Sequence, residues 1–244
     1  MCLTYFLPEY NDYILPVSIG LRVFWLIQLY NYGIVYYTNP DGPYGVGHKT
    51  LKLKGKTTPS ISIFYPIDRQ EYEDNLDNSS KTSSFVLEGF NGVAGIAIIF
   101  KSMNPKLFQG IMNYRLRAIN DAELHSDFKD GSKKMTPVII SHGSKFNRTS
   151  HASIAYYLAS YGWIVYWIDH TDGSCTYYQN CTLNPPFDIY FEEYHIEDHE
   201  ISYQKFIQLQ MEVRVADMNI LIEFIKSEAK KSKMFECECI GKSL

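Results

Sequence analysis

Polar residues that could take part in acyl transfer follow two apolar runs of this chain. Residues 141–144 (Ser-His-Gly-Ser) come directly after the run at 137–140, and residues 169–174 (Asp-His-Thr-Asp-Gly-Ser) come after the run at 163–168. A glycine-containing loop at a strand end can aim backbone N–H groups at an oxyanion, and serine and histidine are side chains of nucleophilic catalysis. The sequence therefore predicts a site for ester chemistry where these two runs end.

The elements around these residues predict a strand–helix–strand unit. The β-branched run at 137–140 is typical of a buried parallel strand. We expect Ser150 to cap a helix over residues 153–159 that ends at Gly162, before the second strand. Because the carboxyl ends of parallel strands meet at one edge of a sheet, both polar clusters should line one pocket of an α/β fold.

Two further patterns extend this sheet. Alternation at 50–54 and at 60–65 predicts an antiparallel pair at the sheet edge, closed by Pro66. Apolar residues at helical spacing predict an amphipathic helix over about 208–231 that packs on the sheet. The residues of this stripe are Met211, Val215, Met218, Leu221, Ile222 and Ile225.

The intervening segments are expected to be irregular. Residues 68–84 are charged and rich in serine and asparagine, which indicates a solvated loop. The glycines in 85–100 count against a regular helix there. Residues 101–134 are expected to be an insertion with one short helix near 107–116.

The amino-acid composition limits the classes of function that this chain can have. A chain of 244 residues with 45% hydrophobic residues can bury a sizeable core. The net charge of -4 and the pI near 6.0 offer no basic face, which disfavours nucleic-acid binding.

The apolar segment at 14–29 is a candidate for lipid contact. Arg22 interrupts it and it is shorter than the ~20 residues that a spanning helix needs. It also lacks the features of a signal peptide, so we expect a core-packing or interfacial helix and favour the cytoplasm. The oligomeric state is left open.

No metal site is expected. His195 and His199 share a helical spacing with acidic neighbours, but a solvated acidic turn is the simpler interpretation. Cys237 and Cys239 lack two further ligands. The odd number of cysteines argues against a disulfide framework, although Cys175 and Cys181 could pair in an oxidising compartment.

Several blocks, taken in order along the chain, resemble the plasma-type platelet-activating-factor acetylhydrolase family. They are residues 42–47, 64–66, 139–143, 148–149, 158–162, 169–174 and 210–214. The resemblance implies a partial α/β-hydrolase fold with a mostly parallel sheet and an antiparallel N-terminal edge, lacking the C-terminal half. We therefore divide the chain into an aromatic, apolar N-terminal segment, residues 1–41, and an incomplete hydrolase domain, residues 42–244.

The resemblance also implies an activity. Members hydrolyse short or oxidised sn-2 acyl chains of phospholipids, as 1-alkyl-2-acetylglycerophosphocholine esterases, and need no metal or organic cofactor. A phospholipid or lipid surface is the expected partner, with peripheral membrane contact through residues 14–30 and 85–100. In such a fold the serine on a tight turn attacks, and two backbone N–H groups hold the oxyanion.

The resemblance also implies the site residues, by their positions in the matching blocks. The Ser144 N–H becomes the oxyanion donor, and Gly143 lets the substrate approach the backbone. The family usually has an apolar residue where Ser144 stands. Ser243, in 240–244, is the candidate nucleophile, although the last glycine of Gly-x-Ser-x-Gly is missing.

The attacking machinery is incomplete by this comparison. No segment remains to supply the family's aspartate and histidine, so we expect the chain to be nearly inactive on its own. A substitute triad from Ser141, His142, Asp169 and His170 was weighed against a structural role for Ser-His-Gly, which we favour. The alternatives are a non-catalytic lipid- or partner-binding pseudoenzyme and a piece of a longer protein.

Overall fold

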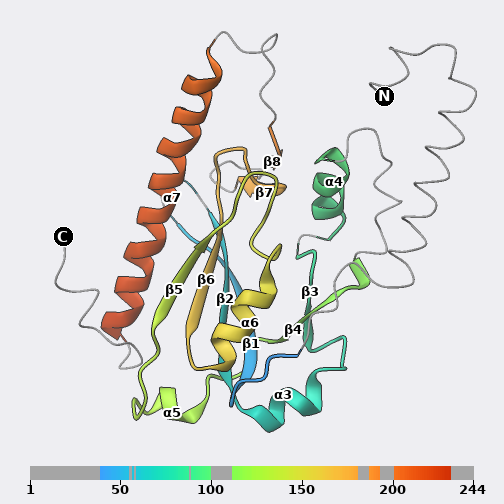
Figure 1. The fold of residues 1–244 in the computed structure, drawn as a ribbon, viewed down its shortest axis with the longest axis vertical. Helices are drawn as coiled ribbons and strands as arrows, with labels where there is room; N and C mark the ends of the chain where they lie inside the picture. Colours follow the sequence, from blue (N-terminus) through green and yellow to red (C-terminus); the bar gives the residue numbers. More distant parts are fainter. Residues whose placement is uncertain are drawn as a thin grey trace, which may run out of the picture. The chain divides into compact units, whose positions relative to one another are not determined.

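The computed structural model describes residues 39–54, 57, 59–87, 89–99, 112–180, 187–192 and 201–231. All of them belong to the unit that starts at Asn39. Its main sheet is β3 (Thr82–Ser84), β4 (Arg115–Asn120), β1 (Gly45–Lys52), β2 (Ser60–Ile67), β6 (Ile164–Asp169) and β5 (Pro137–Ser141), in this spatial order (Figure 1). A separate hairpin joins β7 (Tyr177–Asn180) to β8 (Phe187–Tyr190).

The sheet is mixed, but most of its strands share one direction. β5 and β6 are parallel, β6 and β1 are each antiparallel to β2, and β4 is parallel to β1. These four strands therefore run the same way, with helices between them. The α/β fold class is confirmed, as is the antiparallel pairing of β1 with β2.

The helices are α3 (Arg69–Asn75), α4 (Gly89–Ile99), α5 (Ser126–Lys129), α6 (Ala152–Ser160) and α7 (Tyr203–Lys231). Helices α6 and α7 cover opposite faces of the sheet. Tyr166 of β6 contacts Phe224 of α7, whereas the next residue, Trp167, stacks on His151 at the start of α6. Because successive side chains of a strand point to opposite faces, β6 is buried on both.

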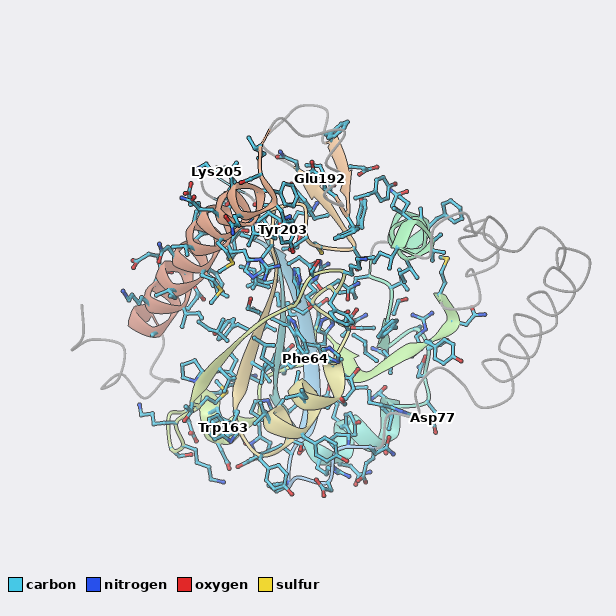
Figure 2. The ribbon with its side chains drawn as sticks, turned by 45° about the horizontal axis from the view of Figure 1, so that its top comes forward. Phe64, Asp77, Trp163, Glu192, Tyr203 and Lys205 are labelled. Atoms are coloured by element: carbon cyan, nitrogen blue, oxygen red, sulfur yellow. The ribbon has the colours of Figure 1, made fainter. Side chains whose placement is uncertain are left out.

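The core lies between these layers. Phe64 of β2 is fully buried and packs edge-on against Tyr156 of α6, while Trp163 stays partly exposed at the periphery (Figure 2). Among the described residues, no helix is both long enough and apolar enough to cross a bilayer.

Several sequence expectations about elements were wrong. The antiparallel pair does not form the sheet edge, because β4 and β3 continue the sheet beyond β1. β1 starts earlier than predicted, and Pro66 lies inside β2. The supposed loop at 68–84 contains α3, whose first turn is capped by the Asp68 carboxylate accepting from the Glu71 N–H at 2.9 Å.

The glycine-rich stretch forms α4, and β4 begins where part of a short helix was expected. Glycine serves close packing here: a Cβ on Gly95 would lie 2.5 Å from the Thr176 carbonyl oxygen. The cost of glycine in a helix is therefore offset by a close approach to the segment that enters β7.

The ends of α6 and α7 also differ from the prediction. α6 starts after His151, and Ser150 instead bonds to Asn147 in the preceding turn, while Gly162 ends the helix with a φ of +94°, as expected. In α7 the buried line passes through Asp217, Leu221, Ile225 and Ala229, while Met211 and Val215 are more than half exposed. The predicted stripe packs only in its C-terminal part.

Candidate active site

The ends of β5 and β6 bring the two polar clusters together. The strands pair in parallel up to Ser141, which lies opposite Ile168, so the residues that follow each strand leave the sheet at the same edge. β5 is the last strand on its side of the described sheet. The prediction that these two segments are neighbours is confirmed.

The segment after β5 makes a tight turn. The Phe146 N–H donates to the Gly143 carbonyl at 3.3 Å, and Lys145 has a φ of +69°. A positive φ at the third residue is what a type II turn requires, and glycine usually supplies it. Holding a lysine there costs about 1–2 kcal/mol, so neighbouring contacts must enforce the turn.

Those contacts come from residues 174–176. The Lys145 N–H donates to the Ser174 carbonyl at 2.8 Å, and Thr176 bonds to the carbonyls of Lys145 and Phe146 at 3.0 and 3.2 Å. We refer to residues 142–146, which include the residues predicted for the oxyanion hole, as the oxyanion loop. These hydrogen bonds join it to the segment that leads from β6 into β7.

His142 stabilises the loop through hydrogen bonds of both its ring nitrogens. Its Nε2 accepts from the His170 N–H at 3.0 Å, so Nδ1 carries the proton and donates to the Gly143 carbonyl at 2.7 Å. Burial lowers the pKa of His142, which keeps the ring neutral. This is a structural role, because both ring nitrogens are used within the backbone of the two strand ends.

Arg214 of α7 donates hydrogen bonds to three acceptors in the same region. Its guanidinium donates to the Asp172 carboxylate at 2.6 Å, to the His142 carbonyl at 3.0 Å and to the Ser174 hydroxyl. Burial alone would raise the pKa of Asp172, but hydrogen bonds from Ser174 and Arg214 outweigh it, and the net pKa lies below its ordinary value. α7 is thereby joined to both strand ends.

Asp169 is occupied elsewhere. Its carboxylate pairs with the buried Arg148 side chain and accepts the Arg148 N–H at 2.6 Å. Among the described residues no histidine donates a hydrogen bond to it, so it does not take the part of the aspartate that orients the histidine of a triad.

Ser141 and His170 do meet. The Ser141 Oγ lies 2.7 Å from the His170 Nε2, and the His170 Nδ1 faces the Asp217 Oδ2 of α7 at 3.5 Å. His170 and Asp217 are completely buried, whereas Ser141 is exposed. Asp217 was missed by sequence reasoning because nothing local distinguishes it from other helical acids.

The two residues predicted for the oxyanion hole are the donor Ser144 and its neighbour Gly143. Gly143 and Ser144 are both exposed, and neither N–H donates to an acceptor within the described part of the chain. A Cβ on Gly143 would meet only the Phe146 ring, at an ordinary 3.4 Å. Ser243, the predicted nucleophile, lies outside the described residues.

One cluster has the spacing of a metal site but not its chemistry. Ligand atoms of His142, Asp169 and Cys175 lie within 4.8 Å of one another. However, His142 uses both nitrogens, the Cys175 thiol donates to the Tyr177 carbonyl, and Asp169 holds the Arg148 cation. A guanidinium already in place repels a metal ion. The residues that the sequence analysis weighed as metal ligands and set aside, His195, His199, Cys237 and Cys239, lie outside the described residues, as does Cys181.

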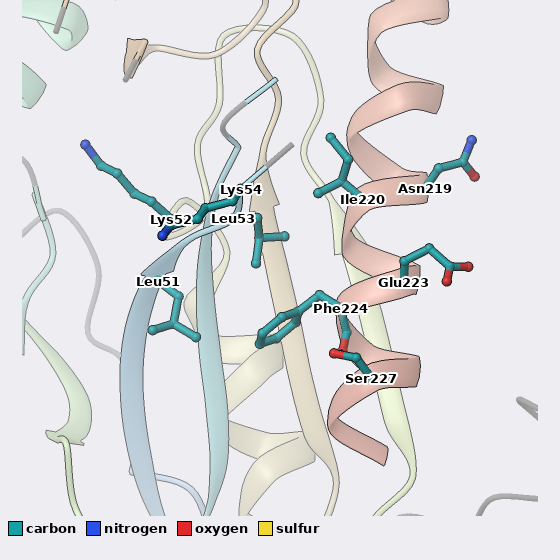
Figure 3. Close-up of a pocket in the computed structure, with 9 residues that line it drawn as sticks. All are labelled: Leu51, Lys52, Leu53, Lys54, Asn219, Ile220, Glu223, Phe224 and Ser227. Carbon is teal, nitrogen blue, oxygen red and sulfur yellow. The ribbon is translucent and has the colours of Figure 1, made fainter. Parts of the chain in front are cut away.

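A cleft of about 690 Å³ lies between the end of β1 and α7. Figure 3 shows Leu53, Ile220 and Phe224 pointing into it, while Asn219 points away. Neither Ser141 nor the oxyanion loop lines this cleft. We therefore place the candidate active site at the strand ends and not in this cleft.

Comparisons with known proteins place this arrangement in a family. The sequence profile of platelet-activating factor acetylhydrolase, isoform II, matches residues 33–235. A platelet-activating factor acetylhydrolase from Canis lupus familiaris is 28% identical over 142 residues, which cover 57% of this chain and 29% of that protein. The match therefore spans less than a third of the relative's length.

Among solved structures, a ferulic acid esterase from Streptomyces cinnamoneus matches 75% of this chain and 47% of its own, with a TM-score of 0.48 and 15% identity. The family profile alone covers most of the chain, including both strand ends and the oxyanion loop. The chain belongs to the platelet-activating factor acetylhydrolase, isoform II, family.

Proposed function

We propose that this chain forms the oxyanion-binding part of a carboxylic-ester hydrolase that acts on short sn-2 acyl chains of phospholipids, as a 1-alkyl-2-acetylglycerophosphocholine esterase does. The observation that carries the proposal is that Gly143 and Ser144 are exposed and that neither N–H donates to an acceptor within the described part of the chain. Family membership supports the reaction class.

The loop has the properties that oxyanion stabilisation needs. Two N–H groups that have no acceptor among the described residues follow the carboxyl end of β5, and hydrogen bonds with His142, Arg214 and residues 174–176 hold the loop. Donors that are fixed in advance stabilise a tetrahedral oxyanion without reorganising during the reaction. The ground-state carbonyl gains less, so the effect falls on the transition state.

The surroundings suit an apolar substrate. Phe146, in the loop itself, is 43% exposed, and the exposed side chains of α4 include Phe90 and Ile98. α4 packs through Gly95 on Thr176, which is bonded to the loop. Acyl or alkyl chains could therefore contact these side chains near the donors.

Replacing Ser144 tests the proposal sharply. Ser144→Pro deletes one N–H, and proline suits the second position of this turn. Because the triad is incomplete, the full chain is expected to give only the residual rate that an oxyanion hole supports. We expect this residual hydrolysis of an sn-2 acetyl phospholipid to fall about 10²–10³-fold in kcat, the usual cost of one lost oxyanion donor. The matched control is Ser144→Ala, which keeps the N–H and should change kcat by no more than about threefold.

Other outcomes would reject the proposal. Equal hydrolysis by Ser144→Pro and Ser144→Ala would show that the N–H does not work in the reaction. Absence of hydrolysis by the folded wild-type chain, with retained binding to vesicles that contain the phospholipid, would favour the pseudoenzyme.

A further inference from the structure

A row of rings leads from the oxyanion loop to the start of α6. A Cβ placed on Gly143 would lie 3.4 Å from the Phe146 ring, so this ring is next to the glycine. The centroids of the Phe146 and His151 rings are 5.0 Å apart, and His151 stacks in turn on Trp167 at 6.3 Å, with 26° between the ring planes. The imidazole of His151 therefore lies close to the N–H groups of the oxyanion loop.

These contacts fix the ring of His151 but do not use its nitrogens. Trp167 is 1% exposed, and Phe146 belongs to the turn that residues 174–176 hold by hydrogen bonds, so both neighbours of the ring are well fixed. His151 is the N-cap residue of α6, yet its side chain makes no capping hydrogen bond. The residue is exposed, and no described residue bonds to either nitrogen. A polar side chain that packing holds in place, with its polar atoms unused, is suited to bind a ligand.

The chemistry of this position favours an anionic oxygen. The imidazole carries one N–H when neutral and two when protonated, so it can donate in either state. Hydrogen bonds to charged acceptors are the stronger ones, and the first turn of α6 adds a partial positive charge beside the ring. The arginines at the strand ends already serve carboxylates, because Arg148 pairs with Asp169 and Arg214 with Asp172. His151 is therefore the donor that a bound anion meets next to the loop.

We propose that His151 binds the phosphate of a phospholipid whose sn-2 carbonyl oxygen lies at the Ser144 N–H. The identity of the ligand rests on the proposed function. A short acyl group offers no acceptor beyond the ester itself, whereas the glycerol part carries a phosphate a few bonds from the reacting carbonyl. One aromatic ring separates His151 from Gly143, which is a comparable span. His151 holds the substrate and exchanges no proton with the ester.

Two ligands that differ only in the phosphocholine group test the subsite. They are short-chain analogues of 1-alkyl-2-acetylglycerophosphocholine and of 1-alkyl-2-acetylglycerol, each with an amide in place of the sn-2 ester so that neither is consumed. Calorimetry on the full chain, with both ligands below their micelle concentrations, should give an affinity about tenfold higher for the phosphocholine ligand, as one hydrogen bond to a charged group contributes. His151→Phe keeps an aromatic ring and removes both nitrogens. It should abolish this difference and leave the affinity for the acetylglycerol analogue unchanged.

Further variants separate the hydrogen bond from the stacked ring. His151→Gln keeps a donor but not the ring, and should retain part of the difference. Tyr161→Phe, at the opposite end of α6, is the control and should bind both ligands as the wild type does. The phosphocholine ligand should also shift the His151 imidazole resonance, and the acetylglycerol analogue should not. If His151→Phe does not fold, this resonance decides.

The ester itself gives a second readout. An interaction made equally in the ground state and the transition state changes KM and not kcat. His151→Phe should therefore raise KM for the phospholipid about tenfold at unchanged residual kcat, whereas Ser144→Pro lowers kcat.

The outcomes distinguish this inference from the proposed function. Equal affinity of the wild type for the two ligands, binding of neither, or an undiminished difference in His151→Phe would overturn the phosphate subsite. An equal resonance shift with inorganic phosphate would assign His151 to free phosphate and reject the phospholipid. Equal hydrolysis by Ser144→Pro and Ser144→Ala, together with a difference in affinity that depends on His151, would keep the subsite and reject the proposed function.

Discussion

Arg214 is the side chain that joins α7 to both strand ends. Its side chain is 18% exposed, and its partner Asp172 is completely buried at the carboxylate. The other two acceptors belong to the loop and to Ser174. A planar fork that serves three acceptors cannot be replaced by the point charge of lysine.

Arg214→Met should therefore lower the free energy of unfolding by about 3–5 kcal/mol, because it leaves the Asp172 carboxylate buried and unpaired. Arg214→Lys should recover part of the stability but not the bond to the His142 carbonyl. Urea unfolding measures the first effect. The double variant Arg214→Met, Asp172→Asn is the control: it removes the stranded charge and should be more stable than Arg214→Met alone.

Gly143 is a residue whose replacement should affect activity without affecting stability. A methyl group there has room in the free protein, since its nearest neighbour is 3.4 Å away, and the residue has no positive φ. Gly143→Ala should keep the melting temperature within about 2 °C of wild type, because surface changes cost little. Ester hydrolysis should fall about tenfold or more, because the methyl obstructs approach to the N–H groups. Unchanged hydrolysis would place the substrate elsewhere.

Sequence reasoning found some of these residues and missed others for a physical reason. Gly143 and Ser144 follow a strand directly, so local pattern is enough to place them at the sheet edge. Arg214 and Asp217 reach the same strand ends only through the packing of α7, and their partners His142 and His170 lie 72 and 47 residues earlier in the chain. Long-range contacts of this kind leave no local signal.

At the scale of elements, α4 is held by a close approach and not by its own propensity. Gly95 packs against the Thr176 carbonyl, which belongs to the segment bonded to the oxyanion loop. The same contact links the helix to the site. Periodicity alone could not predict it, because glycine usually indicates a break in a helix.

Gly95→Ala should consequently destabilise the protein although alanine is the better helix former. Its Cβ would stand 2.5 Å from a backbone oxygen, so the helix must shift, at a cost of about 1–3 kcal/mol. Ile98→Ala, a change at an exposed residue of the same helix, should cost about 0.5 kcal/mol or less. Denaturant midpoints of the two variants give the comparison. A stabilised Gly95→Ala would show that the helix stands farther from Thr176.

The sheet was predicted well where burial was continuous. β5, α6 and β6 followed from two apolar runs and a helix stop at Gly162. The short strand β3 and the start of β4 were not predicted, because these residues form strands by pairing with each other and with β1. Strands of a few residues carry too little periodicity to be separated from loops.

At the scale of the whole molecule, buried histidines tie stability to pH. Burial lowers the pKa of His48 to about 3 and also lowers that of His142. His48 bonds to Ser83 through Nδ1, while its Nε2 is buried without a partner in the described residues. A proton on Nε2 would therefore place an unpaired charge in the core, beneath Phe64.

The lowered pKa values determine how the stability of the fold changes with pH. In the unfolded chain a histidine binds a proton below about pH 6.5, but folded His48 does not until the pH approaches 3. The unfolded state then binds more protons, so stability decreases as the pH falls, by up to about 1.4 kcal/mol per pH unit for each such histidine. Between pH 6.5 and 5 most carboxylates remain ionised, so this window isolates the histidines.

Urea unfolding at pH 7.5, 6.5, 5.75 and 5.0 should therefore give a free energy that is flat above about pH 7 and then falls by about 2 kcal/mol or more by pH 5. His48→Gln should be less stable at pH 7.5 because the core repacks, but its slope below pH 6.5 should be smaller, with the part due to His142 remaining. Ser83→Ala is the matched control: it loses the hydrogen bond at every pH and keeps the wild-type slope, since His48 still titrates only when the chain unfolds. An equal slope in wild type and His48→Gln would mean that His48 is already protonated, and paired, in the folded protein.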